Sequence, residues 1–226
     1  MYDETTRAAY PFLARLEAAA PDLLAEVAAL DEARWAAAQG YSDGVHVCVF
    51  EAGRFLHEFD AAEVERARAD CPAAAAVVGT IEGVRLAGYQ RFVHGAGMAV
   101  HTDPRANNMV RCILGLQLPT AEQAWWPPGR ARLLDTRLPH WARNDDAAPR
   151  YTLVLDIQMP FPVDSSGWPP WRLDGPRDLA RPAGDLPEAA FRAQRQLARG
   201  GGASDPGPML AGGDAFEAEE EMDEDE

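Results

Sequence analysis

Between Ile81 and Met159 the sequence is divided into short apolar runs, and this division limits the fold more than any other feature of the chain. Gly, Pro, Asn and Asp separate the runs, which are VRLAGYQRF, MAVHTD, MVRCILGLQLP, ARLLD and YTLVLDIQM. Several short strands at such intervals are typical of a β-sandwich or a β-barrel. We therefore expect this part of the chain to be mainly β.

The residues before these runs have the spacing of helices and one further strand. From Tyr10 to about Gln39 apolar residues recur at helical intervals, and Pro21 suits the first turn of a second helix. The alternation in VHVCVFEAGRF predicts a strand over Val45 to Phe50, and AAEVERARAD predicts an exposed helix that ends at Cys71-Pro72. We expect two amphipathic N-terminal helices, then this strand and helix.

The composition divides the chain into a body and a tail. With 226 residues, 47% of them hydrophobic, the chain is long enough for one domain with a sizeable core. We place that domain at residues 1–173 and expect the Pro/Gly-rich and acidic residues 174–226 to be largely disordered. Nine acids and no bases lie between Ala211 and Glu226, which leaves −6 of the formal charge of −15 for the body. Such a body argues against nucleic-acid binding, which needs clustered bases.

The cysteines and the first residues indicate a cytoplasmic protein. Cys48, Cys71 and Cys112 are odd in number and widely spaced, which is typical of reduced, buried thiols. The start MYDETTRAAY has neither a basic nor an apolar signal region, and no run of about 18 apolar residues is present. We expect neither export nor a membrane span.

The triplet His101-Thr102-Asp103 places two metal-binding side chains where the pattern predicts a sheet. On one strand, residues two apart point to the same face. His140 follows the strand-like ARLLD and offers a third ligand, and two His with one carboxylate are the set that non-heme Fe(II) oxygenases use. An HxD triplet also occurs by chance, and Asp103-Pro104 is also typical of a turn after a strand.

Arg150 strengthens the metal interpretation. It opens the strand YTLVLDIQM, ten positions after His140. An arginine facing into a barrel needs an anionic partner, because a buried unpaired guanidinium is costly. A dicarboxylate that chelates iron through its 2-oxo acid end would supply this anion and be held bidentately.

From about Tyr10 to Pro160 the sequence resembles the aspartyl/asparaginyl β-hydroxylase-like Fe(II)/2-oxoglutarate dioxygenases, a family that includes bacterial proline hydroxylases. Three stretches carry the resemblance, in the family's order and spacing: CPAAAAVVGTIEGVRLAGYQRFVHGAGMAVHTD, RCILGLQLP and LLDTRLPHWARNDDAAPRYTLVLDI. With the strand pattern, it implies a double-stranded β-helix, or jelly roll, with the N-terminal helices packed on one sheet.

The resemblance also implies roles for individual residues. His101, Asp103 and His140 are similar to the family's iron ligands, and Arg150 to the arginine that holds the far carboxylate of 2-oxoglutarate. Arg111 matches an arginine directed toward a carboxylate of cosubstrate or substrate. Gln90 stands where family members place a polar cosubstrate contact. The implied cofactors are Fe(II), 2-oxoglutarate as cosubstrate and O2.

Three positions and one segment depart from patterns found in the family. Asp103 stands where the vertebrate-type peptidyl hydroxylases have glycine, so this chain keeps the full triad, as the proline hydroxylases do. Ile113 replaces a histidine that many members have, and Thr136 replaces an acid before the last histidine. The segment 119–131 is short, as if a hairpin were missing.

These observations predict a dioxygenase that hydroxylates an amino acid, free or within a small peptide, with succinate and CO2 as co-products. Two alternatives remain at this stage: a protein side-chain hydroxylase, which predicts a wide groove, and a non-catalytic β-barrel with an acidic docking tail. Three further sets of residues each have two interpretations. Asp135 braces His140 or forms a turn, His94 lines a pocket or lies in a solvated loop, and several tryptophans line a substrate entrance or close the barrel, namely Trp125, Trp126, Trp141, Trp168 and Trp171.

Overall fold

The computed structural model describes residues 2, 4–38, 43–53, 60–103, 108–138, 140–160, 162, 163, 165 and 168. The predicted domain boundary at residues 173 and 174, and the tail beyond it, lie outside the described residues. The described helices are α1 (Glu4–Ala9), α2 (Phe12–Ala29), α3 (Ala61–Asp70), α4 (Pro72–Val78) and α5 (Thr120–Gln123), with a 3-10 turn at Glu32–Arg34.

Two antiparallel sheets form the β part. The large sheet has the order β1-β2-β3-β8-β5-β6, and β4 and β7 form the small sheet. The strands are β1 (Ala36–Ala37), β2 (Val45–Glu51), β3 (Val84–Phe92), β4 (Gly97–His101), β5 (Met109–Gln117), β6 (Ala131–Leu134), β7 (His140–Arg143) and β8 (Arg150–Gln158). Every apolar run predicted as a strand is one.

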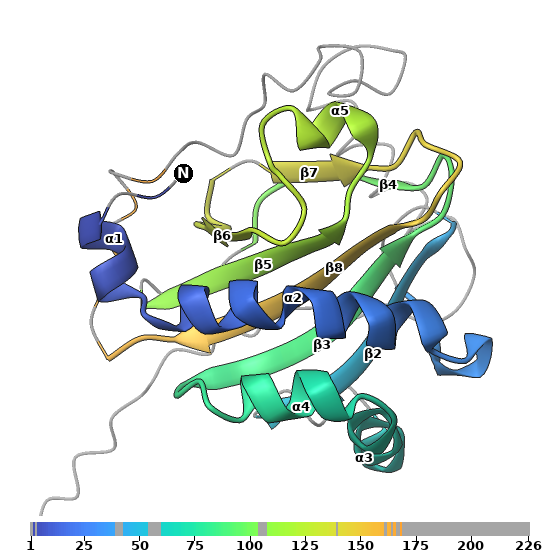
Figure 1. The fold of residues 1–226 in the computed structure, drawn as a ribbon, viewed down its shortest axis with the longest axis horizontal. Coiled ribbons are helices and arrows are strands. Elements are labelled where there is room, and N and C mark those ends of the chain that lie inside the picture. Colours follow the sequence, from blue (N-terminus) through green and yellow to red (C-terminus); the bar gives the residue numbers. More distant parts are fainter. Residues whose placement is uncertain are drawn as a thin grey trace, which may run out of the picture.

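Strand β8 shows how the large sheet separates a core face from a polar face. Leu153, Leu155 and Ile157 are buried in the main core together with residues of α2 and α4, and α2 runs across this face of the sheet (Figure 1). Because side chains alternate along a strand, Arg150 and Asp156 point to the opposite face. The polar residues of the family motifs are therefore gathered on the face opposite α2 and α4.

The small sheet lies opposite this polar face. From β5, Arg111 reaches Asp103, which follows β4. The Asn144 side chain, just after β7, donates to the backbone oxygen of Phe92 in β3. Two facing antiparallel sheets with helices packed outside one of them confirm the predicted jelly roll, although the strands in the described residues do not close into a barrel.

The predicted break at Pro21 is wrong, because α2 continues through it. Proline lacks the N–H that would bond one turn back, which weakens the helix locally. The buried residues of α2 nevertheless keep one helical register on both sides of Pro21, and burying this single stripe holds the helix together. They are Phe12, Leu13, Leu16, Ala20, Leu23 and Val27.

Sequence reasoning also missed α4, which starts at Pro72 directly after the predicted end of α3. Glu26 of α2 accepts hydrogen bonds from the backbone N–H groups of Ala73 and Ala74, at 2.6 and 3.1 Å. This carboxylate satisfies donors of the first turn of α4 and complements its positive end. A contact between residues so far apart in sequence has no local signal.

Two predictions from composition can be compared with the structure. Cys48, Cys71 and Cys112 are free and buried, as expected. Within the described part of the chain, no helix has both the length and the apolar character required to cross a membrane.

Candidate active site

The pairing of β4 with β7 brings the two predicted metal-binding histidines together. His101 ends β4 and His140 begins β7, and the two are direct partners in the antiparallel register. Their ring centroids are 4.2 Å apart. The sequence did not predict β7, since WAR is too short to alternate, but this strand is what holds His140 in place.

Asp103 completes the cluster. Its backbone N–H donates to the Thr136 oxygen at 2.8 Å, which fixes the chain just after β4. Its Oδ1 lies 3.6 Å from His101 Nε2, and its Oδ2 lies 3.9 Å from His140 Nε2. The possible ligand atoms of the three residues all lie within 4.8 Å of one another, so this donor set fits a metal ion.

His140 presents its Nε2 atom to this cluster. Its Nδ1 lies 3.0 Å from the Leu138 carbonyl oxygen, which can only accept, so Nδ1 carries the proton and Nε2 the lone pair. Nε2 is buried and has no hydrogen-bond partner in the described part of the chain. Burial, and then the neighbouring His101, lower the pKa of His140 to about 4. The ring is therefore neutral at pH 7, as metal binding requires.

The suggestion that Asp135 braces His140 is wrong, and the turn interpretation holds. The Asp135 carboxylate accepts from the Arg137 backbone N–H, from the Arg137 guanidinium and from Ser165. The backbone oxygen of Asp135 accepts from Leu138 N–H, which closes a turn before His140. The brace on the His140 ring is a backbone carbonyl instead, so a search for acidic residues could not find it.

Arg111 connects the cluster to the large sheet. Its Nε and Nη2 donate to the two oxygens of Asp156, its partner across β5 and β8, at 2.8 and 3.0 Å. Its Nη1 donates to Asp103 Oδ2 at 3.0 Å. The guanidinium predicted to meet a cosubstrate or substrate carboxylate thus contacts two carboxylates of the protein. Because Asp156 is fully buried, this fork fixes the direction in which Arg111 points.

Replacing Asp156 by asparagine is expected to weaken metal binding. The amide can accept only one of the two guanidinium hydrogen bonds without conflict, so Arg111 loses its orientation and Asp103 its support. Residues that orient metal ligands typically contribute 10- to 100-fold in metal affinity. Fluorescence titration with Mn(II) would measure the change. Asp135→Asn, which disturbs a different aspartate–arginine pair, serves as the control, and equal metal affinities in both variants would contradict this role for Asp156.

Arg150 lies at the start of β8, as predicted, and it is buried. Its guanidinium carbon lies 5.1 Å from the centre of the Phe92 ring and 5.6 Å from that of Trp126. Its Nε donates to Glu122 Oε2 at 3.0 Å. The sequence argument expected an anion beside this cation, and the protein supplies one of its own.

Comparison with known protein families identifies the chain. The sequence model described as "Aspartyl/Asparaginyl beta-hydroxylase" matches residues 21–160, which is more than half of the chain and includes the whole cluster. The chain belongs to the aspartyl/asparaginyl β-hydroxylase family. This membership indicates a hydroxylase, hence an oxidoreductase. No curated protein matches the chain.

Three solved structures are remotely similar to this family member. A prolyl-4-hydroxylase from Pseudomonas putida has 15% identity and a TM-score of 0.36, over 64% of this chain and 88% of the other. HygX from Streptomyces hygroscopicus, solved with nickel and 2-oxoglutarate, has 11% identity and a TM-score of 0.38, over 64% and 80%. A predicted oxalate decarboxylase from Thermotoga maritima has 13% identity and a TM-score of 0.32, over 54% and 86%.

Two residues beside Arg150 were missed by the sequence analysis of this β-hydroxylase family member. Glu122 of α5 had no pattern to mark it, because a glutamate in a short loop helix is usually exposed. Thr152 lies two residues after Arg150, on the same face of β8; its side chain is fully buried and its hydroxyl has no hydrogen-bond partner among the described residues. Strand alternation applied to Arg150 would have identified it.

Gln90 lies in the same row of the sheet as Thr152. The two are direct partners across β3 and β8, so both point to the polar face. The Gln90 amide donates to the sulfur of Met98 in β4, at 3.8 Å, which places it between the two sheets. Gln90 therefore lies on the wall of the large sheet that also carries Arg150.

The remaining candidates have structural surroundings. His94 lies in an exposed turn, and its Nδ1 is 3.2 Å from the Asp146 oxygen, as the loop interpretation predicts. Trp126 and Trp141 are buried, which favours closing the fold over lining an entrance. Trp168 packs edge-on against Tyr10. Trp171 lies outside the described residues.

Proposed function

We propose that this chain is an Fe(II)- and 2-oxoglutarate-dependent dioxygenase that hydroxylates an amino acid, free or as a residue of a small peptide. The observation that supports it most is the approach of His101, Asp103 and His140 from two separate segments to one point between the sheets. Two imidazoles and one carboxylate on one side of a metal leave coordination positions for a cosubstrate and O2.

Hydrogen bonds prepare two of these side chains for a metal ion. His140 is held as the tautomer whose Nε2 can donate its lone pair, and Arg111 supports the Asp103 carboxylate. Fe(II) with 2-oxoglutarate and O2 supplies the oxidising chemistry, in which one oxygen atom enters the substrate and succinate and CO2 are released. The protein contributes position, charge and exclusion of water.

The wall formed by β3 and β8 suits the distal carboxylate of 2-oxoglutarate. Arg150 offers a guanidinium held between two aromatic rings. The buried hydroxyl of Thr152 lies next to it on the same face and supplies a second donor. Gln90, directly opposite Thr152, supplies an amide. A carboxylate here would find three donor groups, which suits an anion, although Glu122 already accepts from Arg150 Nε.

An amino acid or small peptide is the substrate class that we favour. The chain keeps the carboxylate ligand Asp103, which the resemblance associates with the proline hydroxylases rather than with the vertebrate peptidyl enzymes.

Because Arg111 is shared between Asp103 and Asp156, this guanidinium is tied to the metal ligand. We assign it a contact with whichever carboxylate approaches the metal.

The test is an oxygen-dependent reaction of the purified, iron-loaded protein. Protein incubated anaerobically with Fe(II) and 2-oxoglutarate is exposed to O2 with libraries of amino acids and short peptides, and separately with intact folded proteins. The expected result is succinate in amounts equal to a product that has gained one oxygen atom, measured by mass spectrometry. Succinate that forms only with intact folded proteins as substrate would redirect the proposal to side-chain hydroxylation, and no succinate with any substrate would contradict it.

A further inference from the structure

The buried pair of Glu122 and Arg150 has a consequence for cosubstrate binding. Their side chains are only 4% and 2% exposed, and the hydrogen bond between Glu122 Oε2 and Arg150 Nε measures 3.0 Å. A charge-assisted hydrogen bond in a site with so little water is strong, and breaking it from one side is costly. The Arg150 guanidinium, which we propose binds a diacid, is thus already paired with a carboxylate of the protein.

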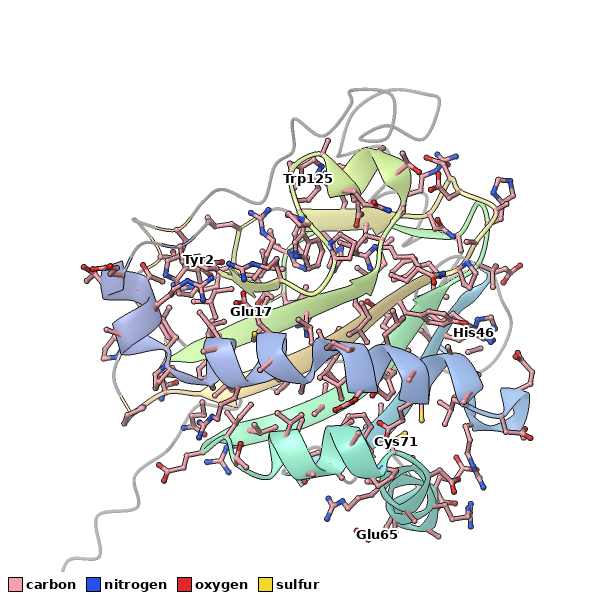
Figure 2. The ribbon with its side chains drawn as sticks, in the orientation of Figure 1. Tyr2, Glu17, His46, Glu65, Cys71 and Trp125 are labelled. Carbon is pink, nitrogen blue, oxygen red and sulfur yellow. The ribbon has the colours of Figure 1, made fainter. Side chains whose placement is uncertain are left out.

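Hydrogen bonds of Glu122 and of α5 fix the position of Glu122. Its N–H donates to the Pro119 oxygen at 2.9 Å, and its own oxygen accepts from Trp126 N–H at 2.8 Å. Thr120, at the start of α5, donates from its N–H and its hydroxyl to Asp146 of the turn between β7 and β8. In Figure 2, Trp125 marks this segment, beside α5 at the top of the view. The position of Glu122 is therefore set by the fold around α5.

The geometry leaves one edge of the guanidinium for a ligand. Arginine can bind a carboxylate through Nε and one terminal nitrogen, or through its two terminal nitrogens. Glu122 uses Nε, and Phe92 and Trp126 lie against the guanidinium group. An incoming carboxylate is thus left the edge formed by Nη1 and Nη2.

The charges oppose a second carboxylate. Glu122 and Arg150 together are neutral, so the distal carboxylate of a diacid gains little net attraction and is repelled by Glu122. A carboxylate on the remaining edge and the Glu122 carboxylate would both contact the same guanidinium, and like charges this close repel where little water screens them. Without Glu122, however, the protein free of cosubstrate would bury an unpaired cation.

We propose that Glu122 sets the affinity of this site for 2-oxoglutarate: it balances the charge of Arg150 before the diacid binds and lowers the affinity for the distal carboxylate. This inference rests on the proposed function. Glu122 acts through Arg150 and is a positioning residue. It stabilises the fold when no cosubstrate is bound, and it lowers the affinity for the cosubstrate.

The variant Glu122→Gln tests this directly, because its amide oxygen still accepts from Arg150 Nε while the negative charge is gone. Binding of 2-oxoglutarate is measured by calorimetry without O2, with Mn(II) in place of iron so that no turnover occurs. The dissociation constant is expected to fall at least about tenfold relative to the wild type. The constant for 2-oxobutyrate, which lacks the distal carboxylate, is expected to stay the same.

Glu32→Gln is the matched control. Glu32 forms a two-bond pair with Arg91, which lies next to Phe92 on the other face of β3, and the change in net charge is the same. Its affinity for 2-oxoglutarate is expected to match the wild type. An unchanged or weaker affinity in Glu122→Gln, or an equal gain in Glu32→Gln, would overturn the proposal. No binding of 2-oxoglutarate to the wild type would instead remove the proposed function, and this inference with it.

Glu122→Ala keeps the test decisive if the glutamine variant does not fold. Its melting temperature without ligand is expected to be lower than that of the wild type, because Arg150 is left unpaired. The rise on adding 2-oxoglutarate is expected to be larger, since a ligand that binds the folded state more tightly stabilises it more. A rise equal to or smaller than that of the wild type would overturn the role of Glu122.

Discussion

Replacing His101 by alanine is expected to abolish iron binding at micromolar Fe(II), and with it the turnover of 2-oxoglutarate. His101 is one of three groups that meet at the site, and its ring lies 4.2 Å from that of His140. Residues that only orient metal ligands contribute 10- to 100-fold in affinity, so loss of a ligand itself should exceed about 100-fold. Iron retained after desalting, measured by atomic absorption, and succinate release would report both losses.

His94→Ala is the control for this prediction. His94 lies in an exposed turn and contacts the Asp146 carbonyl oxygen, away from the cluster. The variant is expected to bind iron and to release succinate like the wild type. Iron retained equally by His101→Ala would show that the ion binds elsewhere.

Arg150→Ala is expected to cause two large effects, one on stability and one on cosubstrate binding. Removing the guanidinium leaves the Glu122 carboxylate buried and unpaired, which typically destabilises a protein by about 3–5 kcal/mol. The diacid also loses its charged partner, which corresponds to a loss of at least about 30-fold in affinity. Urea unfolding and calorimetry with 2-oxoglutarate and Mn(II) measure the two effects separately.

A double-mutant cycle distinguishes the buried pair from simple loss of packing. Arg150→Ala combined with Glu122→Ala removes both charges. The double variant is therefore expected to lose less unfolding free energy than the two single variants lose together. Arg91→Ala is a useful comparison for the stability loss at Arg150. It also leaves a carboxylate without its partner, but this carboxylate, Glu32, is largely exposed and water can solvate it. Strictly additive losses at Arg150 and Glu122 would contradict the buried pair.

Most of the fold could be predicted because its signals are local. The strands of the large sheet alternate or are continuously apolar, and turn-forming residues separate them, so β3, β5 and β8 follow from sequence alone. The same alternation placed His101 and Asp103 on one side of their segment. His140 and Arg150 were proposed from their places beside the predicted strands ARLLD and YTLVLDIQM, and the family resemblance implied the same roles.

What could not be predicted depends on contacts between distant residues. Pro21 remains inside α2 because tertiary packing outweighs one lost hydrogen bond. The fork of Arg111 onto Asp103 and Asp156 depends on the register of β5 and β8. Glu122 reaches Arg150 only because α5 folds against the start of β8. None of these contacts has a periodicity or a short motif that a sequence would display.

The central claim is that His101, Asp103 and His140 jointly hold an iron ion to which 2-oxoglutarate binds. The most direct measurement is an anaerobic titration of the protein with Fe(II) and then with 2-oxoglutarate, followed by visible absorption. A charge-transfer band that saturates at one equivalent of each, and that is absent from His101→Ala, is the predicted result. The absence of a band in the wild type, or an unchanged band in His101→Ala, would contradict the claim.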